Sequence, residues 1–576
     1  MVFHAPPVSK GVAIGRAFVF IPFTPRITVS YIEPDAVVSG ADRYLAVAAR
    51  ADEELTQLVQ YLTGQGEPEK AAIFEAHIEI LHDTELADEI LGLIKAEYYA
   101  PEYAVETVYE KFIGILSDAD DEVLHERGMD FKDIKNRILR ILMGVEHKTL
   151  SEINGPAVVF AHDLLPSNTA VMDREKVLAI VTEIGGPTCH SAIIARSYGI
   201  PALLGIANVM EAVNDNDMVI VDAVDGELII GPSEKELEQF GIKQKAYRDR
   251  LAEIEKYRSV PPLTKDGVRI DVCLNIGSTN DDELEAAVFA DGVGLFRSEF
   301  LFMTGKEQPC EERQFKAYKK AAETFGERQV ILRTLDIGGD KTLNYMALPV
   351  EQNPFLGCRA LRLCFKNPDL FKTQLRAILR ASIYGNLAIM FPMVENFEDL
   401  RRAKAVLQEC REELKVEGIP FNEAIKVGIM IEIPAVALIA DLIVSEVDFA
   451  SIGTNDLCQY LLAVDRQNPD LADYYQSFHP GLLRLIDYTA KSFKKAGKPL
   501  SVCGELGGDP LAALVFIGMG IRKLSMSASC IAAVKRIITN LDTAGAKEAA
   551  VKALALSTAA EVEASLKDHV RTKIRR

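Results

Sequence analysis

The run from Gly185 to Arg196 places a histidine where a glycine-rich turn becomes a helix. Gly185 and Gly186 let the backbone approach a ligand closely, and the free N–H groups and dipole of the first helical turn favour an anion. An imidazole at this point could carry a phosphoryl group covalently, because those donors would meet the phosphoryl oxygens. The run therefore indicates His190 as a phosphoryl acceptor, against the simpler alternative of a surface histidine after a tight turn.

A second set of chemically capable residues lies in the second half of the chain. Its arginines offer permanently charged, forked donors that suit a phosphate or a carboxylate, and its carboxylates offer the hard oxygens that Mg²⁺ takes from proteins. The arginines are Arg297, Arg333, Arg359 and Arg466, and the carboxylates are Glu432 and Asp456. The two carboxylates could instead be a general acid and base, but the four arginines favour a metal–phosphate site.

Cys503 lies between Val502 and the pair Gly504-Glu505. A cysteine on a strand is commonly a buried and inert thiol. A thiol at this position could also donate a proton to a carbanion-like intermediate, a task that needs a weak acid rather than a thiolate. The neighbouring residues favour the catalytic interpretation.

These side chains follow apolar segments that alternate with helical sequence. Eight such segments predict parallel strands buried on both faces, which indicates a (β/α)₈ TIM barrel. The expected strands are Val268–Asn275, Gly292–Phe296, Gln329–Leu335, Leu387–Pro392, Lys426–Ile431, Phe449–Gly453, Leu500–Cys503 and Arg522–Met526. Most of the candidate residues, together with Asn275 and Asn455, fall at or just past the carboxyl ends of these strands, where barrel enzymes hold their chemistry.

The first part of the chain changes its hydrophobic period twice. Val8–Phe20 is alternating and β-like, helical spacing follows as far as Met143, and β-type segments return at Ala157. We expect a β/α domain that carries His190, formed by residues 1–25 and 147–232, with a helical bundle, 26–146, inserted into it. A charged helical connector, 233–260, then leads to the barrel, 261–576, so the chain is predicted to be a multidomain α/β protein.

The charge of the chain is concentrated in the predicted insert. Of the net −20, a surplus of 16 negative charges lies between Tyr31 and Glu146, where 26 Asp and Glu stand against 10 Lys and Arg. Such a surplus repels nucleic acid and attracts a basic protein partner, although acidic helix faces are often simply solvated. No apolar stretch approaches the length of a membrane span, and Met1–Pro7 lacks the features of a secretory signal. The nine cysteines are scattered without a CxxC pair, so we expect free thiols and a cytoplasmic enzyme.

Longer motifs add a family resemblance. Gly185–Arg196 resembles the phosphohistidine signature of phosphoenolpyruvate-using enzymes, and Asp448–Arg466 resembles their second signature. Gly292–Phe300, Asp336–Lys341 and Asn353–Gly357 are similar to further family blocks. Because order, spacing and total length agree together, the chain resembles Enzyme I of the bacterial phosphoenolpyruvate-dependent sugar phosphotransferase system along essentially its whole length.

The resemblance implies a reaction and roles for individual residues. A swivelling phosphohistidine domain takes the phosphoryl group of phosphoenolpyruvate from a Mg²⁺-containing barrel site, leaving pyruvate, and passes it to a histidine of the carrier protein HPr. His190 is implied as the acceptor with Thr169 as its hydrogen-bond partner, and Cys503 as the acid that protonates the pyruvate enolate. The implied Mg²⁺ ligands are Glu432 and Asp456, and the implied substrate-binding residues are Arg297, Arg333, Arg359, Asn455, Arg466 and Lys341.

The resemblance also implies partners. The family is a homodimer through its barrels, and HPr docks on the inserted helices. We expect the docking surface between Glu69 and Leu86, with Glu69 and Ile80 as candidates, although Ile80 suits the core of the bundle equally well. Neither nucleic acid nor membrane insertion is expected.

Three alternatives and two departures accompany this interpretation. A pyruvate, phosphate dikinase or phosphoenolpyruvate synthase needs a large nucleotide-binding domain, for which the chain has no room and no Walker-type loop. A paralogous enzyme serving a nitrogen-type carrier and a non-catalytic phosphoenolpyruvate sensor stay open, although a sensor predicts a lost acceptor or lost metal ligands. Pro187 and Cys358 stand where the family commonly has Arg and Trp. We expect a change in transfer rate from the first and looser packing of Arg359 from the second.

Overall fold

The structure is a computed structural model that describes residues 1–21, 23, 25–64, 68–117, 122–145, 149–164, 166–186, 189–303, 307–338, 343, 345–346, 351–468 and 471–574. The chain forms two compact units, Met1–Asp249 and Arg250–Arg576. Across these described ranges, no helix combines the length and the apolar character that a bilayer crossing requires. All nine cysteines fall within the described residues, and each is a free thiol.

The first unit is built on one mixed sheet with the strand order β1-β8-β7-β3-β4-β5-β6-β2. β3 pairs in parallel with β4 and antiparallel with β7, and β4, β5 and β6 are parallel neighbours. The strands are β1 (Val2–His4), β2 (Pro7–Ser9), β3 (Val12–Phe20), β4 (Ala157–Ala161), β5 (Val177–Thr182), β6 (Ala202–Leu203), β7 (Met218–Asp222) and β8 (Glu227–Ile230). The unit also contains the short helices α6 (Pro166–Ala170) and α8 (Val209–Ala212), helix α7 (His190–Tyr198), and the start of α9 (Glu234–Glu255).

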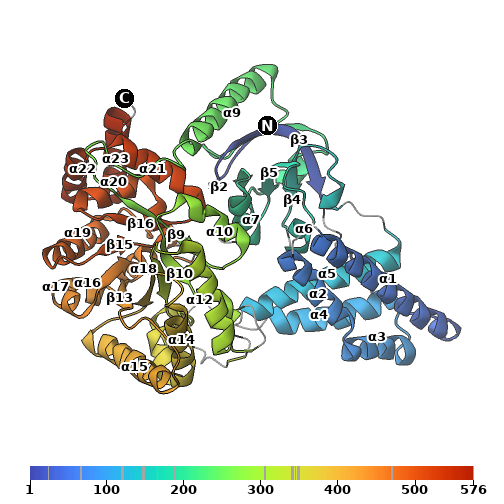
Figure 1. The fold of residues 1–576 in the computed structure, drawn as a ribbon. Coiled ribbons are helices and arrows are strands. Elements are labelled where there is room, and N and C mark those ends of the chain that lie inside the picture. The colour runs from blue at the N-terminus through green and yellow to red at the C-terminus, as the bar shows by residue number, and fades with distance from the viewer. Residues whose placement is uncertain are drawn as a thin grey trace. The chain divides into compact units, whose positions relative to one another are not determined.

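A helical bundle comes between β3 and β4 in the chain (Figure 1). Its helices are α1 (Val37–Gly64), α2 (Pro68–Leu81), α3 (Thr84–Ala96), α4 (Pro101–Ser117) and α5 (Glu122–Met143). The apolar positions at helical spacing pack into a core of their own, in which Ile90, Val108 and Ile134 are fully buried. The bundle therefore has the separate core that a domain of this size requires.

The second unit is a closed barrel of eight parallel strands in the order β9 to β16 (Figure 1). The strands are β9 (Asp271–Ile276), β10 (Val293–Arg297), β11 (Val330–Arg333), β12 (Leu387–Phe391), β13 (Lys426–Ile431), β14 (Phe449–Ile452), β15 (Leu500–Val502) and β16 (Lys523–Met526). The helices of eight or more residues are α12 (Glu311–Phe325), α14 (Pro368–Ala381), α15 (Phe397–Val416), α18 (Thr454–Leu462), α19 (Pro480–Lys495), α20 (Pro510–Met519), α21 (Ile531–Asn540), α22 (Thr543–Ala555) and α23 (Ala559–His569). The predicted fold class, a multidomain α/β chain with a C-terminal TIM barrel, is confirmed.

Candidate active site

One end of the barrel gathers most of the candidate residues. Arg297 and Arg333 are the last residues of β10 and β11 and pair with each other in the strand register. Glu432 directly follows β13, Asp456 lies in the first turn of α18 after β14, and Cys503 directly follows β15. Since the strands are parallel, their carboxyl ends meet at one rim and bring these side chains into one site.

Arg333 is buried among carboxylates. Its Nη2 donates to Glu299 Oε1 at 3.0 Å, and its Nη1 lies 2.9 Å from Asp336 Oδ2. Burial by itself lowers the pKa of the Arg333 guanidinium, but Glu299 and Asp336 outweigh it and raise that pKa above its ordinary value. Within the described residues its Nε has no hydrogen-bond partner, so one buried donor is available to a ligand.

Arg359 is held by two carboxylates and a phenol. Its Nη2 donates to both oxygens of Asp336, at 2.8 and 3.0 Å, and its Nη1 donates to Asp456 Oδ1 at 3.3 Å and to the Tyr460 hydroxyl at 3.2 Å. Burial lowers the pKa of Arg359, and the neighbouring carboxylates raise it by more. The guanidinium also lies 5.8 Å from the ring centre of Phe355. Arg359 is only 3% exposed and other side chains hold it, so the looser packing expected from Cys358 stays a prediction.

Glu432 is completely buried, and one of its two carboxylate oxygens has a hydrogen-bond partner. Its Oε1 accepts a hydrogen bond of 2.6 Å from the backbone N–H of Met393, whose φ of +53° is a left-handed conformation that costs a methionine energy. Its Oε2 has no hydrogen-bond partner within the described residues. Burial, then Asp456 and Asp336, raises the pKa of the Glu432 carboxyl. A Cβ atom on Gly453 would lie 3.1 Å from this Oε2, so the glycine keeps space beside the carboxylate.

Glu432 and Asp456 fit a divalent cation. An unsatisfied buried carboxylate oxygen costs free energy, which a bound cation would recover. Within the described ranges no group of three or more His, Cys, Asp or Glu side chains forms a metal cage. Two carboxylates and open positions are what Mg²⁺ uses when substrate and water complete its coordination.

Cys503 is a protonated thiol in the barrel interior. It is 1% exposed, and its Sγ donates to the carbonyl oxygen of Ile452 at 3.6 Å. Burial raises the pKa of the Cys503 thiol to about 11, although Arg333 pulls it down. The thiol is therefore neutral at physiological pH, the state that a proton donor needs.

The remaining barrel candidates lie at the edge of this cluster. Arg297 is exposed, and Arg466 places its Nη1 3.5 Å from Asp456 Oδ1. Asn455 Oδ1 accepts from the backbone N–H of Glu505 at 2.9 Å, so its amide nitrogen is directed elsewhere. Lys341 lies outside the described residues.

His190 is the first residue of α7, as the glycine-rich turn predicts. Cys189 is the N-cap residue, Gly185 has a φ of +114°, and the helix ends at Gly199 in the left-handed conformation. The His190 side chain and all of Pro187 lie outside what the structure describes. Thr169, on the neighbouring α6, is buried at 2% exposure. The backbone thus offers the free N–H groups of a helix start at the proposed acceptor.

Two candidates fall in the inserted bundle. Ile80 is 8% exposed and packs into the core of the bundle, which is the second of the two roles that its sequence position allowed. We therefore leave it out of any docking surface. The side chain of Glu69 lies outside the described part of the chain.

Sequence reasoning missed the acids that balance the arginines. Glu299 and Asp336 are 3% and 2% exposed, and Tyr460 completes the contacts of Arg359. All three lie inside motifs that carried the family resemblance, yet their types alone gave no reason to pair them with particular arginines. Counting the charges at the predicted strand ends would have signalled that buried acids are needed there.

Comparison with known proteins identifies the family. Models of PEP-utilising enzymes match the chain in three parts: the N-terminal domain over residues 4–127, the mobile domain over 153–226 and the PEP-binding domain over 251–543. A phosphoenolpyruvate-protein phosphotransferase from Bacillus sp. (strain S) is 42% identical over 98% of this chain and 97% of its own length. This chain belongs to the phosphoenolpyruvate-protein phosphotransferase family.

Further members of this phosphotransferase family are similarly close. The protein of the same name from Geobacillus stearothermophilus is 42% identical, with coverage of 98% of this chain and 97% of that protein. The one from Haemophilus influenzae is 40% identical, with 96% of both chains covered. A solution structure of an Enzyme I protein shares 37% identity over 42% of this chain and 99% of that chain, with a TM-score of 0.40. The resemblance predicted from the motifs is confirmed.

Proposed function

We propose that this phosphoenolpyruvate-protein phosphotransferase transfers the phosphoryl group to its own His190 and then to a histidine of the carrier protein HPr. The enzyme class follows from relatives about 42% identical over nearly the whole chain. The observation that carries the residue assignment is the buried cluster of Arg333, Arg359, Glu432 and Asp456 around one barrel rim. Such a density of charge is costly unless a small, highly charged ligand uses it.

The arginines hold the substrate in this proposal. The phosphate and carboxylate of phosphoenolpyruvate compete with Asp336 and Asp456 for the donors of Arg333 and Arg359. Arg297, Asn455, Arg466 and Lys341 complete the binding site. When a Mg²⁺ ion is bound by Glu432 and Asp456, it supplies positive charge against the phosphate and enolate oxygens.

The reaction proceeds in three steps. An imidazole nitrogen of His190 forms a bond to phosphorus while the bond from phosphorus to the enol oxygen breaks, and its electron pair stays on the enolate. Cys503 then gives its thiol proton to the methylene carbon of the enolate, which yields pyruvate, and the thiolate recovers a proton from solvent. Finally, a carrier histidine takes the phosphoryl group from His190, with one N–P bond broken and one formed. Thr169 orients the imidazole.

The relay requires the phosphohistidine domain to move between the barrel and the carrier. The domains of this proposal are 1–25 with 147–232 for the phosphohistidine domain, 26–146 for the insert, 233–260 for the connector and 261–576 for the barrel. The Tyr247 hydroxyl in α9 donates to the carbonyl of Lys10 at 3.3 Å within the first unit, and Lys535 Nζ donates to the carbonyl of Arg258 at 2.8 Å within the second. Residues 248–256 lie between these anchors and all of them except Ile254 are exposed. We therefore propose that the swivel of the phosphohistidine domain is taken up in this segment.

Partners and compartment follow from charge and exposed apolar surface. The surplus of 16 negative charges in the insert suits a basic carrier face, and Glu69 remains a candidate contact. On the barrel, Leu438, Leu442 and Tyr488 are 63%, 56% and 40% exposed on helices that contact one another, which supports a homodimer through this unit. Nine free thiols support a reducing, cytoplasmic location.

Phosphorylation mapping tests the proposal. The full chain is incubated with ³²P-labelled phosphoenolpyruvate and Mg²⁺, with and without HPr, and the labelled residue is located by mass spectrometry. We expect an acid-labile label on His190, none in His190→Ala, and normal labelling in the matched variant His162→Ala, which changes an exposed histidine of the same unit. Undiminished carrier labelling by His190→Ala refutes the relay. Labelling of the enzyme with transfer only to a nitrogen-type carrier refutes HPr as the partner and leaves the activity.

A further inference from the structure

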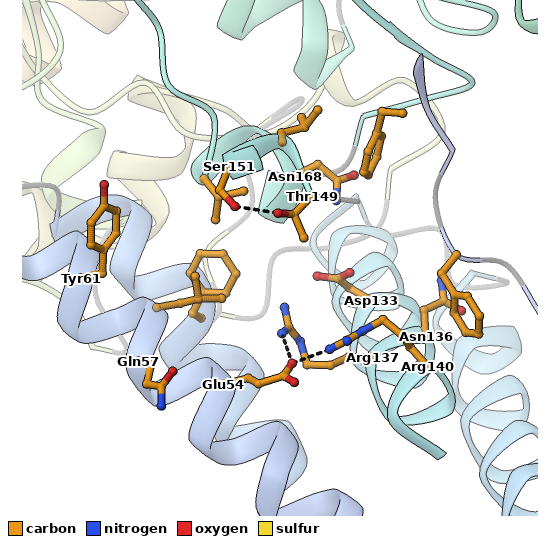
Figure 2. Close-up of a pocket in the computed structure, with 16 residues that line it drawn as sticks. Glu54, Gln57, Tyr61, Asp133, Asn136, Arg137, Arg140, Thr149, Ser151 and Asn168 are labelled. Carbon is orange, nitrogen blue, oxygen red and sulfur yellow. Dashed lines mark hydrogen bonds and ion pairs between the residues drawn. The ribbon is translucent and has the colours of Figure 1, made fainter. Parts of the chain in front are cut away.

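A cavity of about 520 Å³ lies within the first unit, and none of the residues assigned to the reaction lines it. Its walls come from α1, α2 and α5 of the inserted bundle on one side, and from β3, segment 149–151 and the region of α6 on the other (Figure 2). A volume of this size is ordinary for a small-molecule site. We propose that the cavity binds a small amphipathic anion, in which a carboxylate or phosphate group is attached to a planar apolar body.

The anion-binding end is formed by two arginines that share one carboxylate. Glu54 Oε2 accepts from Arg137 Nη1 at 3.1 Å and from Arg140 Nη2, and Figure 2 shows both contacts at the lower wall of the cavity. Each guanidinium has five N–H donors, so the pair keeps donors that Glu54 does not use. The two side chains are 19% and 23% exposed, and partial burial strengthens their attraction for an anion.

The wall holds a second carboxylate, Asp133, which forms no ion pair with Arg137 or Arg140. Asp133 Oδ2 lies 3.7 Å from Nδ1 of His77, a buried imidazole whose Nε2 lies 3.2 Å from Asp130. Asp133 Oδ2 has no hydrogen-bond partner among the described residues, and Arg137 and Arg140 have only Glu54 as a charged partner among the lining residues. A ligand carboxylate or phosphate placed on the arginine side completes the pairing.

Aromatic rings and small polar groups shape the rest of the cavity. Phe20 and Phe74 are 3% and 1% exposed and present fixed apolar surface. Thr149 and Ser151 face the arginines from the opposite wall, with their hydroxyl oxygens 2.6 Å apart (Figure 2). Flat apolar surface beside a few placed polar groups is the lining that orients a planar ligand with one charged end.

The position of the cavity gives its ligand a consequence for the enzyme. Asn168 lines the cavity next to Thr169, so a bound ligand joins the inserted bundle to the helix that carries the proposed partner of His190. This consequence, a changed rate of His190 phosphorylation, rests on the proposed function. Binding itself does not, so the two are separable by experiment.

Binding is tested with 4-(trifluoromethyl)benzoate as the probe, followed by ¹⁹F NMR titration of the full chain. We expect Arg137→Gln to weaken binding about tenfold, since a hydrogen bond to a charged group is lost. Glu54→Gln should tighten binding severalfold, because it releases two guanidinium groups from a competing carboxylate. The matched control Arg50→Gln changes an exposed arginine that also faces Glu54 but lies outside the cavity, and it should leave the affinity unchanged.

The two variants of lining residues are expected to change the affinity for the probe in opposite directions, which makes the test decisive. Equal affinity in all four proteins overturns the proposal, because a probe bound at the barrel arginines does not sense residue 54. Weaker binding by Glu54→Gln also overturns it. Should Arg137→Gln unfold in a thermal scan, Gln57→Glu takes its place, since this residue lines the cavity from an exposed helix position and its new charge should weaken binding. Altered probe binding with unaltered His190 phosphorylation refutes only the consequence for the relay.

Discussion

Replacing Cys503 by serine isolates the proposed proton transfer from the phosphoryl transfers. The change swaps Sγ for a smaller oxygen at a position that is 1% exposed and hydrogen-bonded to Ile452. The serine keeps a donor of similar reach, so the variant loses acidity rather than contact. We expect slow formation of pyruvate in an enzyme that still carries phosphate on His190.

The size of the effect follows from the acidity of the two groups. With a pKa of about 11, the Cys503 thiol is almost entirely protonated at pH 7. A serine hydroxyl is an acid close to water, whose pKa of ~15.7 makes it weaker by about five pKa units. General acid catalysis contributes roughly 10²–10⁴-fold. We therefore expect pyruvate formation to fall at least about 100-fold, or ~2.7 kcal/mol in activation free energy.

Two assays separate the half-reactions. Pyruvate release from phosphoenolpyruvate is followed in a coupled lactate dehydrogenase assay, and methyl-proton exchange of pyruvate in D₂O reports the reverse protonation step. Both should collapse in Cys503→Ser. Phosphoryl exchange between His190 and the carrier, started from phosphorylated carrier, should run at the wild-type rate because Cys503 takes no part in it.

Cys458→Ser is the matched control. Cys458 is also 1% exposed, burial raises the pKa of its thiol to about 11, and its Sγ donates to the carbonyl of Gln476 at 3.7 Å. It shares burial and acidity with Cys503 but has no assigned place in the reaction. Wild-type pyruvate release by Cys503→Ser, or an equal loss in Cys458→Ser, would refute the assignment of Cys503 as the acid.

Other perturbations test the charge balance, the connector and the dimer. Asp336→Asn should lower the free energy of unfolding by about 3 kcal/mol in urea titrations, because two buried arginines lose a carboxylate partner. Glu299→Gln should lower it by less, because Glu299 pairs with one arginine. A larger loss of stability in Glu299→Gln than in Asp336→Asn would contradict this reasoning. Ala252→Pro in the connector should slow transfer from phosphoenolpyruvate to His190 while carrier exchange stays normal, and equal slowing of both would exclude a hinge. Leu442→Glu should lower the mass in light scattering, and Val416→Glu, a control at a barrel position that is 90% exposed, should not.

Sequence patterns were most informative where chemically reactive or charged residues lie at the ends of predicted strands. Arg297 and Arg333 lie at the carboxyl ends of apolar strands, so their meeting at one rim could be predicted from the parallel barrel alone. Cys503 is buried and its thiol has a raised pKa, a state that suits both an inert thiol and a proton donor, so its catalytic role stays a prediction. Ile80 shows the limit of periodicity, since a helical apolar position reads the same whether it faces a core or a partner.

The balance of charge was beyond prediction. Arg359 and Asp456 are 97 residues apart in the chain, and Asp336 serves Arg333 and Arg359 together. Met393 adopts a left-handed conformation and its backbone N–H donates to Glu432. No residue type in that segment predicts this conformation. Such pairings depend on distances through space, which a one-dimensional pattern does not contain.

The order of residues along the chain was sufficient to predict the barrel, the order of its strands and the residue types at their carboxyl ends, because burial of a parallel strand on both faces leaves a continuous apolar signature. It also determined the helix start at His190, because glycines before a helix set the local backbone. Three-dimensional packing was needed to identify the acids that neutralise Arg333 and Arg359, and to find that the bundle and the sheet enclose a cavity lined by Arg137 and Glu54. The physical reason is that local patterns specify which face of an element is buried, whereas packing selects which faces meet.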